Sequence, residues 1–120
     1  MMSFGLAPGQ KHSRAEEFSL RDELASVMPD SHHRFLASLR SAYICGDFFV
    51  THAGVRPGIA LDLQSEDDLM WIREPFLNSR HQYFGKMVVH GHTPVREPEI
   101  RSNRINIDTG AYATGCLSVL

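Results

Sequence analysis

The chain has 120 residues, which is enough for one domain and too short for two of ordinary size. Hydrophobic residues make up 42% and charged residues 22%, a composition that is typical of folded globular domains and excludes a disordered chain. Twelve basic and fourteen acidic residues give a formal net charge of −2, so the chain offers no basic field for nucleic acid.

Membrane-spanning segments, secretory signals and paired cysteines each have a recognisable pattern in a sequence. No segment approaches the roughly 20 apolar residues of a membrane-spanning helix, and the N-terminus lacks the pattern of a secretory signal. These features predict a cytoplasmic protein that binds neither membranes nor nucleic acid. Cys45 and Cys116 lie far apart and outside any CxxC motif, so both are expected to be reduced, mostly buried thiols.

The N-terminal third predicts a loop and then two helices. Residues 1–10 lack periodicity, whereas Ser13 and Glu16 form a capping box that opens a helix ending at Pro29. Apolar residues recur along this helix at helical spacing: Leu20, Leu24, Val27 and Met28. A second helix is expected to follow, with Asp30 or Ser31 as its cap and three apolar residues on its buried side: Phe35, Leu36 and Leu39.

The first residues of this second helix also have the DxH spacing of some metal ligands. They read Asp30, Ser31 and His32, but no apolar strand and no glycine-rich turn precede them. Helix capping is therefore the better interpretation of Asp30.

Two apolar strands are each followed by a histidine. Residues 43–45 and 48–51 predict a hairpin around Gly46 and Asp47, and its second strand leads into His52. Residues 87–89 form another β-prone run, which leads into His90, Gly91 and His92 before Pro94. A single HxH pair is usually an ordinary loop edge, but histidines from two neighbouring strands can meet at one ion.

The remaining segments predict a short helix and further strands. Ser65 and Asp68 form a capping box for a helix that extends to Glu74 and is stopped by Pro75, with Arg73 near its C-terminus. Residues 100–101 and 105–108 predict strands around a turn at 102–103. Residues 117–120 begin a last apolar run, and its abrupt end suggests truncation inside a strand.

Four segments in series resemble one known family. HAGVRPG at 52–58, DLMWIREPF at 68–76, VVHGHTP at 88–94 and INIDTGA at 105–111 resemble the C-terminal half of a bacterial serine/threonine phosphoprotein phosphatase. That family belongs to the calcineurin-like metallophosphoesterases. The resemblance is firm from Tyr43 to Gly115 and implies an α+β fold. The expected architecture is part of an αββα β-sandwich flanked by helices, with the whole chain, 1–120, as one partial domain whose N-terminal half is missing.

The resemblance implies roles for individual residues. His52 and His92 match ligands of the family's second metal ion, and Arg73 matches an arginine that holds the substrate phosphate. Asp108 lies in a family signature and is expected to orient His92 without contacting the ion. His90 precedes the motif and is not a family ligand. Pro94 replaces a further ligating histidine of other metallophosphoesterases, which favours the phosphatase branch.

The implied chemistry needs more ligands than this sequence supplies. The family uses two divalent ions to activate a bridging water and clamp a phosphoester, with manganese expected and iron or zinc as alternatives. The GDxHG, GDxxDRG and GNHE motifs that complete the site are absent, and Gly46-Asp47 directly precedes the strand of His52 and cannot replace them. We therefore expect weak metal binding, no substantial activity of the chain alone, and self-association through open sheet edges. The expected substrate is a phosphorylated protein or a small phosphoester.

Three other interpretations remain open. A diadenosine tetraphosphate hydrolase shares the HAG and GHT motifs, and a non-catalytic remnant would keep them without activity. The run INIDTGA also matches the signature of retroviral-type aspartic proteases, which act as dimers. In those enzymes much of the barrel follows the motif, whereas ten residues follow Gly110 here.

Overall fold

The computed structural model describes residues 14–80 and 82–120, except for the side chains of Ala15 and Glu16. The chain forms two compact units, one that extends to Leu39 and one from Arg40 to Leu120. The loop expected at residues 1–10 and the capping box expected at Ser13 lie outside the described residues. None of the helices in the described ranges is long and apolar enough to cross a membrane.

The first unit contains two helices, α1 (Arg14–Val27) and α2 (Asp30–Ser38). Pro29 separates them as predicted, but the cap expected from Asp30 or Ser31 is wrong. Pro29 itself occupies the N-cap position of α2, and no side-chain hydrogen bond caps the helix. The cap is absent because Asp30 already has helical geometry as the first residue of α2, so Pro29 sets the entry angle.

The apolar side of α2 is exposed, which contradicts the expected burial of Phe35, Leu36 and Leu39. Helical periodicity identifies which residues share a face, but burial needs a second layer to cover that face. No residue of α2 is buried.

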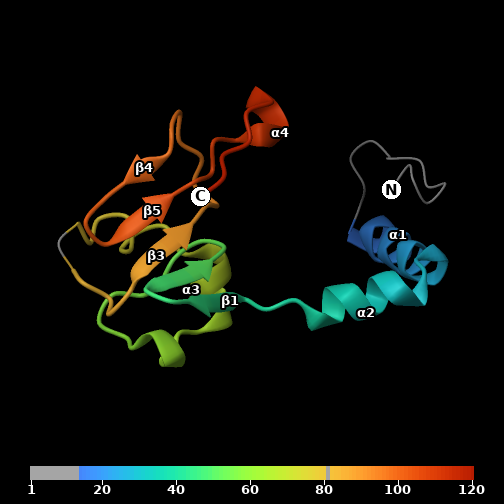
Figure 1. The fold of residues 1–120 in the computed structure, drawn as a ribbon. Helices are drawn as coiled ribbons and strands as arrows, with labels where there is room; N and C mark the ends of the chain where they lie inside the picture. The colour runs from blue at the N-terminus through green and yellow to red at the C-terminus, as the bar shows by residue number, and fades with distance from the viewer. Residues whose placement is uncertain (1–13, 81) are drawn as a thin grey trace. The chain divides into compact units, whose positions relative to one another are not determined.

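The second unit is built on a five-stranded mixed sheet, which confirms the α+β class (Figure 1). Its strand order is β1-β2-β3-β5-β4, and the bounds are Ala42–Cys45 for β1, Phe48–Thr51 for β2, Met87–His90 for β3, Glu99–Ile100 for β4 and Arg104–Asn106 for β5. The central strands β2, β3 and β5 run parallel, and the antiparallel strands β1 and β4 form the two edges.

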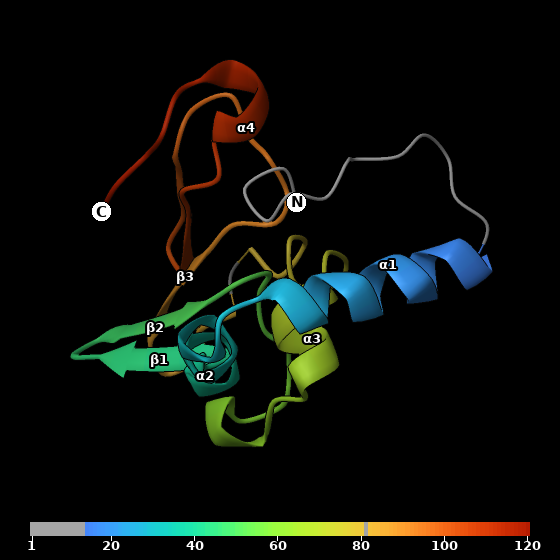
Figure 2. The ribbon, with the colours of Figure 1, turned by 90° about the vertical axis from the view of Figure 1, so that its right-hand side faces the viewer.

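The predicted β1–β2 hairpin is confirmed, and its strands lie side by side in Figure 2. Ala42 pairs with Thr51 and Cys45 with Phe48, which leaves Gly46 and Asp47 as the turn. Gly46 has φ +54°, a left-handed conformation that glycine adopts without steric cost. The turn expected at residues 102–103 likewise joins β4 to β5.

Helix α3 (Glu66–Trp71) begins at the predicted cap, where the Ser65 side chain accepts a hydrogen bond from the Asp68 N–H. The helix ends at Trp71, earlier than expected, because Ile72 is extended and the residue before Pro75 disfavours helical geometry. The short helices η2 (Leu61–Leu63) and α4 (Ala111–Thr114) complete the unit.

One face of the sheet carries the core. Buried side chains from β2, β3, α3 and the loops that follow β2 and α3 pack together there: Phe49, Ala53, Val55, Leu69, Ile72, Phe76 and Val88. Side chains alternate along a strand, so Phe48 and Val50 point to the opposite face, where both remain partly exposed. The core therefore fixes α3 and the loop after β2 against the same side of the sheet.

Two further expectations, about the C-terminal segment and about the cysteines, are wrong. Residues 117–120 form no strand. The Thr109 hydroxyl donates to the Cys116 carbonyl and shares a hydrogen bond with the Ser118 hydroxyl, and these bonds hold the segment in irregular structure. Cys45 and Cys116 are free but exposed rather than buried. Cys45 ends an edge strand at its turn, and Cys116 follows α4 in the same irregular segment.

Gly54 provides a test of how the loop after β2 packs against the core. It has φ +156°, and a Cβ added there would lie 2.2 Å from Cδ1 of the buried Phe76 ring. We expect Gly54→Ala to destabilise the second unit by about 2 kcal/mol or more in urea unfolding, because a buried ring must move. Gly58→Ala is the matched control, since Gly58 has φ +84° but open space around its Cα. Equal losses in the two variants would contradict the packing explanation.

Buried His90 gives stability a pH dependence. Its ring packs edge-on to Phe76 with centroids 4.9 Å apart, and burial lowers its pKa to about 4. The positive charge of Arg104 lowers the pKa further, while Glu99 and hydrogen bonds to the Gly91 and Ala53 backbone oppose the shift. The neutral ring is thus favoured in the folded state.

Because the unfolded chain binds the His90 proton more tightly, stability should fall as pH falls from about 6.5 towards 4. The full loss is on the order of 3 kcal/mol. Urea unfolding followed through the single tryptophan, Trp71, measures the second unit directly. His90→Gln should flatten the profile in this window, whereas His33→Gln in the first unit should not. An unchanged slope in His90→Gln would refute the assignment.

Candidate metal centre

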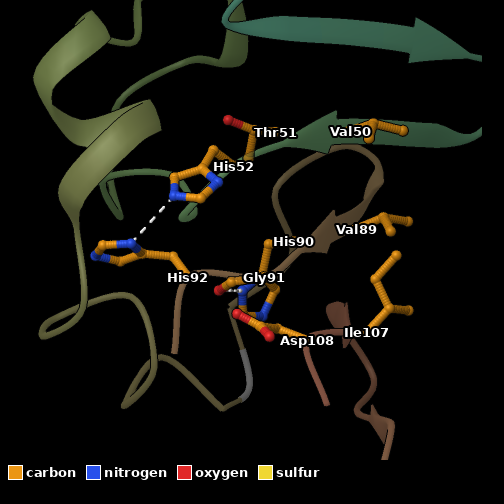
Figure 3. Close-up of a pocket in the computed structure, with 9 residues that line it drawn as sticks. All are labelled: Val50, Thr51, His52, Val89, His90, Gly91, His92, Ile107 and Asp108. Atoms are coloured by element: carbon orange, nitrogen blue, oxygen red, sulfur yellow. Dashed lines mark hydrogen bonds between the residues drawn. The ribbon is translucent and has the colours of Figure 1, made fainter. Parts of the chain in front are cut away.

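The histidine-bearing segments meet at the carboxyl ends of the parallel strands. The backbone ladder continues beyond the strands, because the Gly91 N–H donates to the His52 carbonyl at 2.8 Å and the Ile107 N–H donates to the His90 carbonyl at 3.0 Å. The segments after β2, β3 and β5 therefore lie next to one another (Figure 3). They line a pocket of about 280 Å³ that includes His52, His92 and Asp108.

His52 and His92 point towards one another in this pocket (Figure 3). Nε2 of His52 lies 3.1 Å from Nδ1 of His92, and the ring centroids are 4.9 Å apart. Two imidazole nitrogens at about 2.0–2.1 Å from one cation lie roughly 2.9 to 3.4 Å apart in octahedral or tetrahedral coordination. The observed separation therefore fits two ligands of one ion, and it also fits a hydrogen bond between neutral rings.

The backbone of His92 is in a strained conformation. Its φ of +65° lies in the left-handed region, which non-glycine residues rarely adopt. The preceding residue closes a tight turn, in which the Thr93 N–H donates to the Gly91 carbonyl at 2.8 Å. Strained residues of this kind concentrate at functional sites, where surrounding structure holds them in place.

The surroundings of the His92 ring favour its neutral form. Burial lowers its pKa, the charges of Arg73 and His52 lower it further, and Asp108 opposes them. Its Nε2 is buried without a hydrogen-bond partner among the described residues. A neutral imidazole is the form that binds a metal ion, and the contact between Nδ1 of His92 and Nε2 of His52 allows either ring to be the donor.

Helix α3 holds the backbone on both sides of His52. The Leu69 carbonyl accepts hydrogen bonds from the Ala53 N–H at 2.8 Å and from the Thr51 hydroxyl at 3.1 Å. Further along the loop, Nε of Arg56 donates to Asp68 of α3 at 2.8 Å, and this bond is the main reason why the pKa of Asp68 is lowered. The loop after β2 is thus attached to α3 at two places.

Asp108 stabilises its own loop. Its Oδ1 accepts a hydrogen bond from the Gly110 N–H at 3.0 Å, and its side chain packs so close to Gly91 that a Cβ there would lie 3.2 Å away. No hydrogen bond joins Asp108 to His92 in the described part of the chain, so its orienting role stays a prediction.

Sequence reasoning missed Asn106, which is 1% exposed. Its Nδ2 donates to the Thr93 carbonyl at 2.9 Å, and its Oδ1 accepts from the Asp108 N–H at 3.0 Å. Asn106 therefore connects the loop of His92 to the loop of Asp108. A polar residue between two isoleucines in a strand was the available signal.

Trp71, the last residue of α3, and Arg73, two residues beyond it, lie beside His92. The charge of Arg73 acts on His92, although no hydrogen bond of the Arg73 side chain is present within residues 14–80 and 82–120. The ring of Trp71, which sequence reasoning treated only as part of a helix, lies 5.7 Å from the His92 ring at an interplanar angle of 88°. The pocket is thus lined by the imidazoles of His52 and His92, and a cation and an indole lie beside the second of these rings without lining the pocket.

The described residues do not complete a metal site. They contain no group of three or more His, Cys, Asp or Glu side chains arranged to hold an ion. The two imidazoles fit two positions around one cation, and the other ligands of that ion and the whole set for a second ion are not supplied by the described side chains.

Comparison with known proteins supports the general class. No protein-family model matches the chain. A 42-residue segment, 35% of the chain, is 43% identical to the asymmetrical bis(5'-nucleosyl)-tetraphosphatase PrpE of Anoxybacillus flavithermus, and the match covers 17% of that relative's length. The similarity supports a metallophosphoesterase-like hydrolase, and it does not extend to the serine/threonine phosphatase branch.

The strain at His92 can be measured by comparing two truncations. His92→Gly should be more stable than His92→Ala by about 1 kcal/mol, because alanine keeps the steric cost of φ +65° and glycine does not. Urea unfolding of both variants gives the difference. Asp67→Gly and Asp67→Ala form the control pair, because Asp67 lies inside α3. At this helical position the alanine variant should be the more stable of the two. The same order at both positions would argue against backbone strain at His92.

Proposed function

We propose that residues 40–120 form part of a metal-dependent phosphoester hydrolase in which His52 and His92 hold one divalent cation. The observation that carries this proposal is the 3.1 Å separation between Nε2 of His52 and Nδ1 of His92. The lowered pKa of His92 and its strained backbone support it. Manganese is the expected ion, and iron or zinc would suit imidazole ligands equally.

Different residues in and beside the pocket are proposed to have different roles. When bound, a divalent cation polarises phosphoryl oxygens and favours hydrolysis by water. His52 and His92 present ring nitrogens from two adjacent strand ends, and Arg73 supplies a permanent positive charge that suits bidentate contact with phosphate oxygens. The sequence motifs that would supply a bridging carboxylate and a general acid are absent, and Asp108, the carboxylate that lines the pocket, accepts a hydrogen bond from the Gly110 N–H. The chain alone is therefore expected to bind metal weakly and to lack substantial activity.

The substrate class divides into two candidates. The motif series, with Pro94 after GHT, favours a serine/threonine phosphoprotein, and the relative named a bis(5'-nucleosyl)-tetraphosphatase favours a dinucleoside polyphosphate. Because the matched segment spans 17% of that relative's length, its activity is carried to this chain only as a proposal. A non-catalytic remnant would keep the histidine pair and lack turnover.

Metal titration tests the histidine pair. Mn²⁺ binding, followed by electron paramagnetic resonance of the free ion, should weaken at least tenfold in His52→Ala and in His92→Ala, because each removes one of two ligands. His33→Ala is the matched control, since His33 hydrogen-bonds to the Ala25 carbonyl in the first unit. Unchanged affinity in both ligand variants would eliminate the proposed centre.

An activity assay accompanies this titration. Mn²⁺-dependent hydrolysis of a phosphomonoester by the chain alone, at a rate typical of enzymes and lost in His92→Ala, would show that the chain suffices for catalysis. That result would contradict the expected need for further ligands.

A further inference from the structure

Trp71 is a large aromatic side chain that the core does not use. It is the last residue of α3 and remains 67% exposed, although its neighbours Leu69 and Ile72 are buried in the core. Helix α3 holds it on a firm support, because the Leu69 carbonyl bonds to Ala53 and the Ile72 N–H bonds back to Asp68. The indole is thus presented to solvent from a fixed backbone.

The position of this indole relates it to the candidate metal centre. Its ring meets the His92 ring edge-on, with centroids 5.7 Å apart and an interplanar angle of 88°, and most of the indole surface stays exposed. Arg73, two residues further along, places a positive charge near the same histidine. Trp71 and Arg73 do not line the pocket but lie beside His92, which does, so a ligand that extends from the pocket past His92 meets an aromatic surface next to groups that favour phosphate.

We infer that Trp71 stacks on the base of a nucleoside polyphosphate whose phosphates lie at His52, His92 and Arg73. This inference rests on the proposed function and names its substrate class as nucleotidyl. A planar base matches an exposed indole, and base–aromatic stacking tolerates any base because every base has a π-face. A phosphoserine peptide supplies the phosphate without the base, so it would leave the indole unused.

The single tryptophan makes the test direct. Diadenosine tetraphosphate should quench Trp71 fluorescence saturably, whereas tripolyphosphate, which has no base, and a phosphoserine peptide should not. The titrations are run in chelator and again with Mg²⁺, and free N-acetyltryptophanamide corrects for absorption by the base. Tripolyphosphate should instead compete with diadenosine tetraphosphate for the phosphate groups of the pocket.

Variants separate a binding role from a structural one. In calorimetry, Trp71→Ala should weaken diadenosine tetraphosphate binding about tenfold and leave tripolyphosphate binding unchanged, while Trp71→Phe should retain most of the affinity. Tyr43→Ala is the matched control, because Tyr43 is 66% exposed on the edge strand β1. Circular dichroism confirms that each variant is folded.

Each outcome decides the inference. Equal affinity of Trp71→Ala and wild type for diadenosine tetraphosphate, or no binding of this nucleotide by the wild type, would overturn it. Binding of the phosphoserine peptide that depends on Trp71 would also overturn it and assign the surface to a peptide. If Mn²⁺ binding does not depend on His52 and His92 but nucleotide quenching persists, the proposed metal function fails alone. If Mn²⁺ binding depends on His52 and His92 but diadenosine tetraphosphate does not quench Trp71 fluorescence, the role of Trp71 is refuted and the proposed metal function stands.

Discussion

The site depends on the backbone ladder that continues past the ends of β2, β3 and β5. Parallel strands that end at the same edge bring their following residues into register, and here two hydrogen bonds extend that register, from Gly91 to His52 and from Ile107 to His90. The 3.1 Å approach of the two imidazoles follows from this geometry. Main-chain pairing, rather than contacts of the rings themselves, therefore determines where a cation would be held.

The pocket combines a strained backbone with a cluster of positive and titratable groups. His92 adopts an unfavourable φ, and its pKa is lowered by burial, Arg73 and His52 together. A bound cation would add another positive charge, so an anionic ligand or further carboxylates would be needed to balance the cluster. An anionic phosphoester, the ligand proposed for this pocket, would supply such a balance.

Local sequence signals predicted the parts of the structure that depend on local chemistry. The Gly46-Asp47 turn, the Ser65 cap and the apolar strand before His90 were all readable, because each depends on residues a few positions apart. The adjacency of His52 and His92 was readable because both follow apolar strands. The exposure of Phe35 and of both cysteines could not be predicted from the sequence, since burial depends on whether a distant layer covers these side chains. Trp71 and Asn106 were missed for the same reason: their contacts exist only after the sheet has formed.

The Leu69 carbonyl, which accepts from both Thr51 and Ala53, has an evolutionary consequence. A main-chain oxygen is present whatever residue occupies the position, so substitutions at 69 that preserve the helix and fill the core keep the anchor of the His52 segment. Divergent relatives can then share the geometry of this pocket while differing in the residues that surround it. Searches based on backbone hydrogen-bond patterns should recover such relatives more readily than searches based on residue identity.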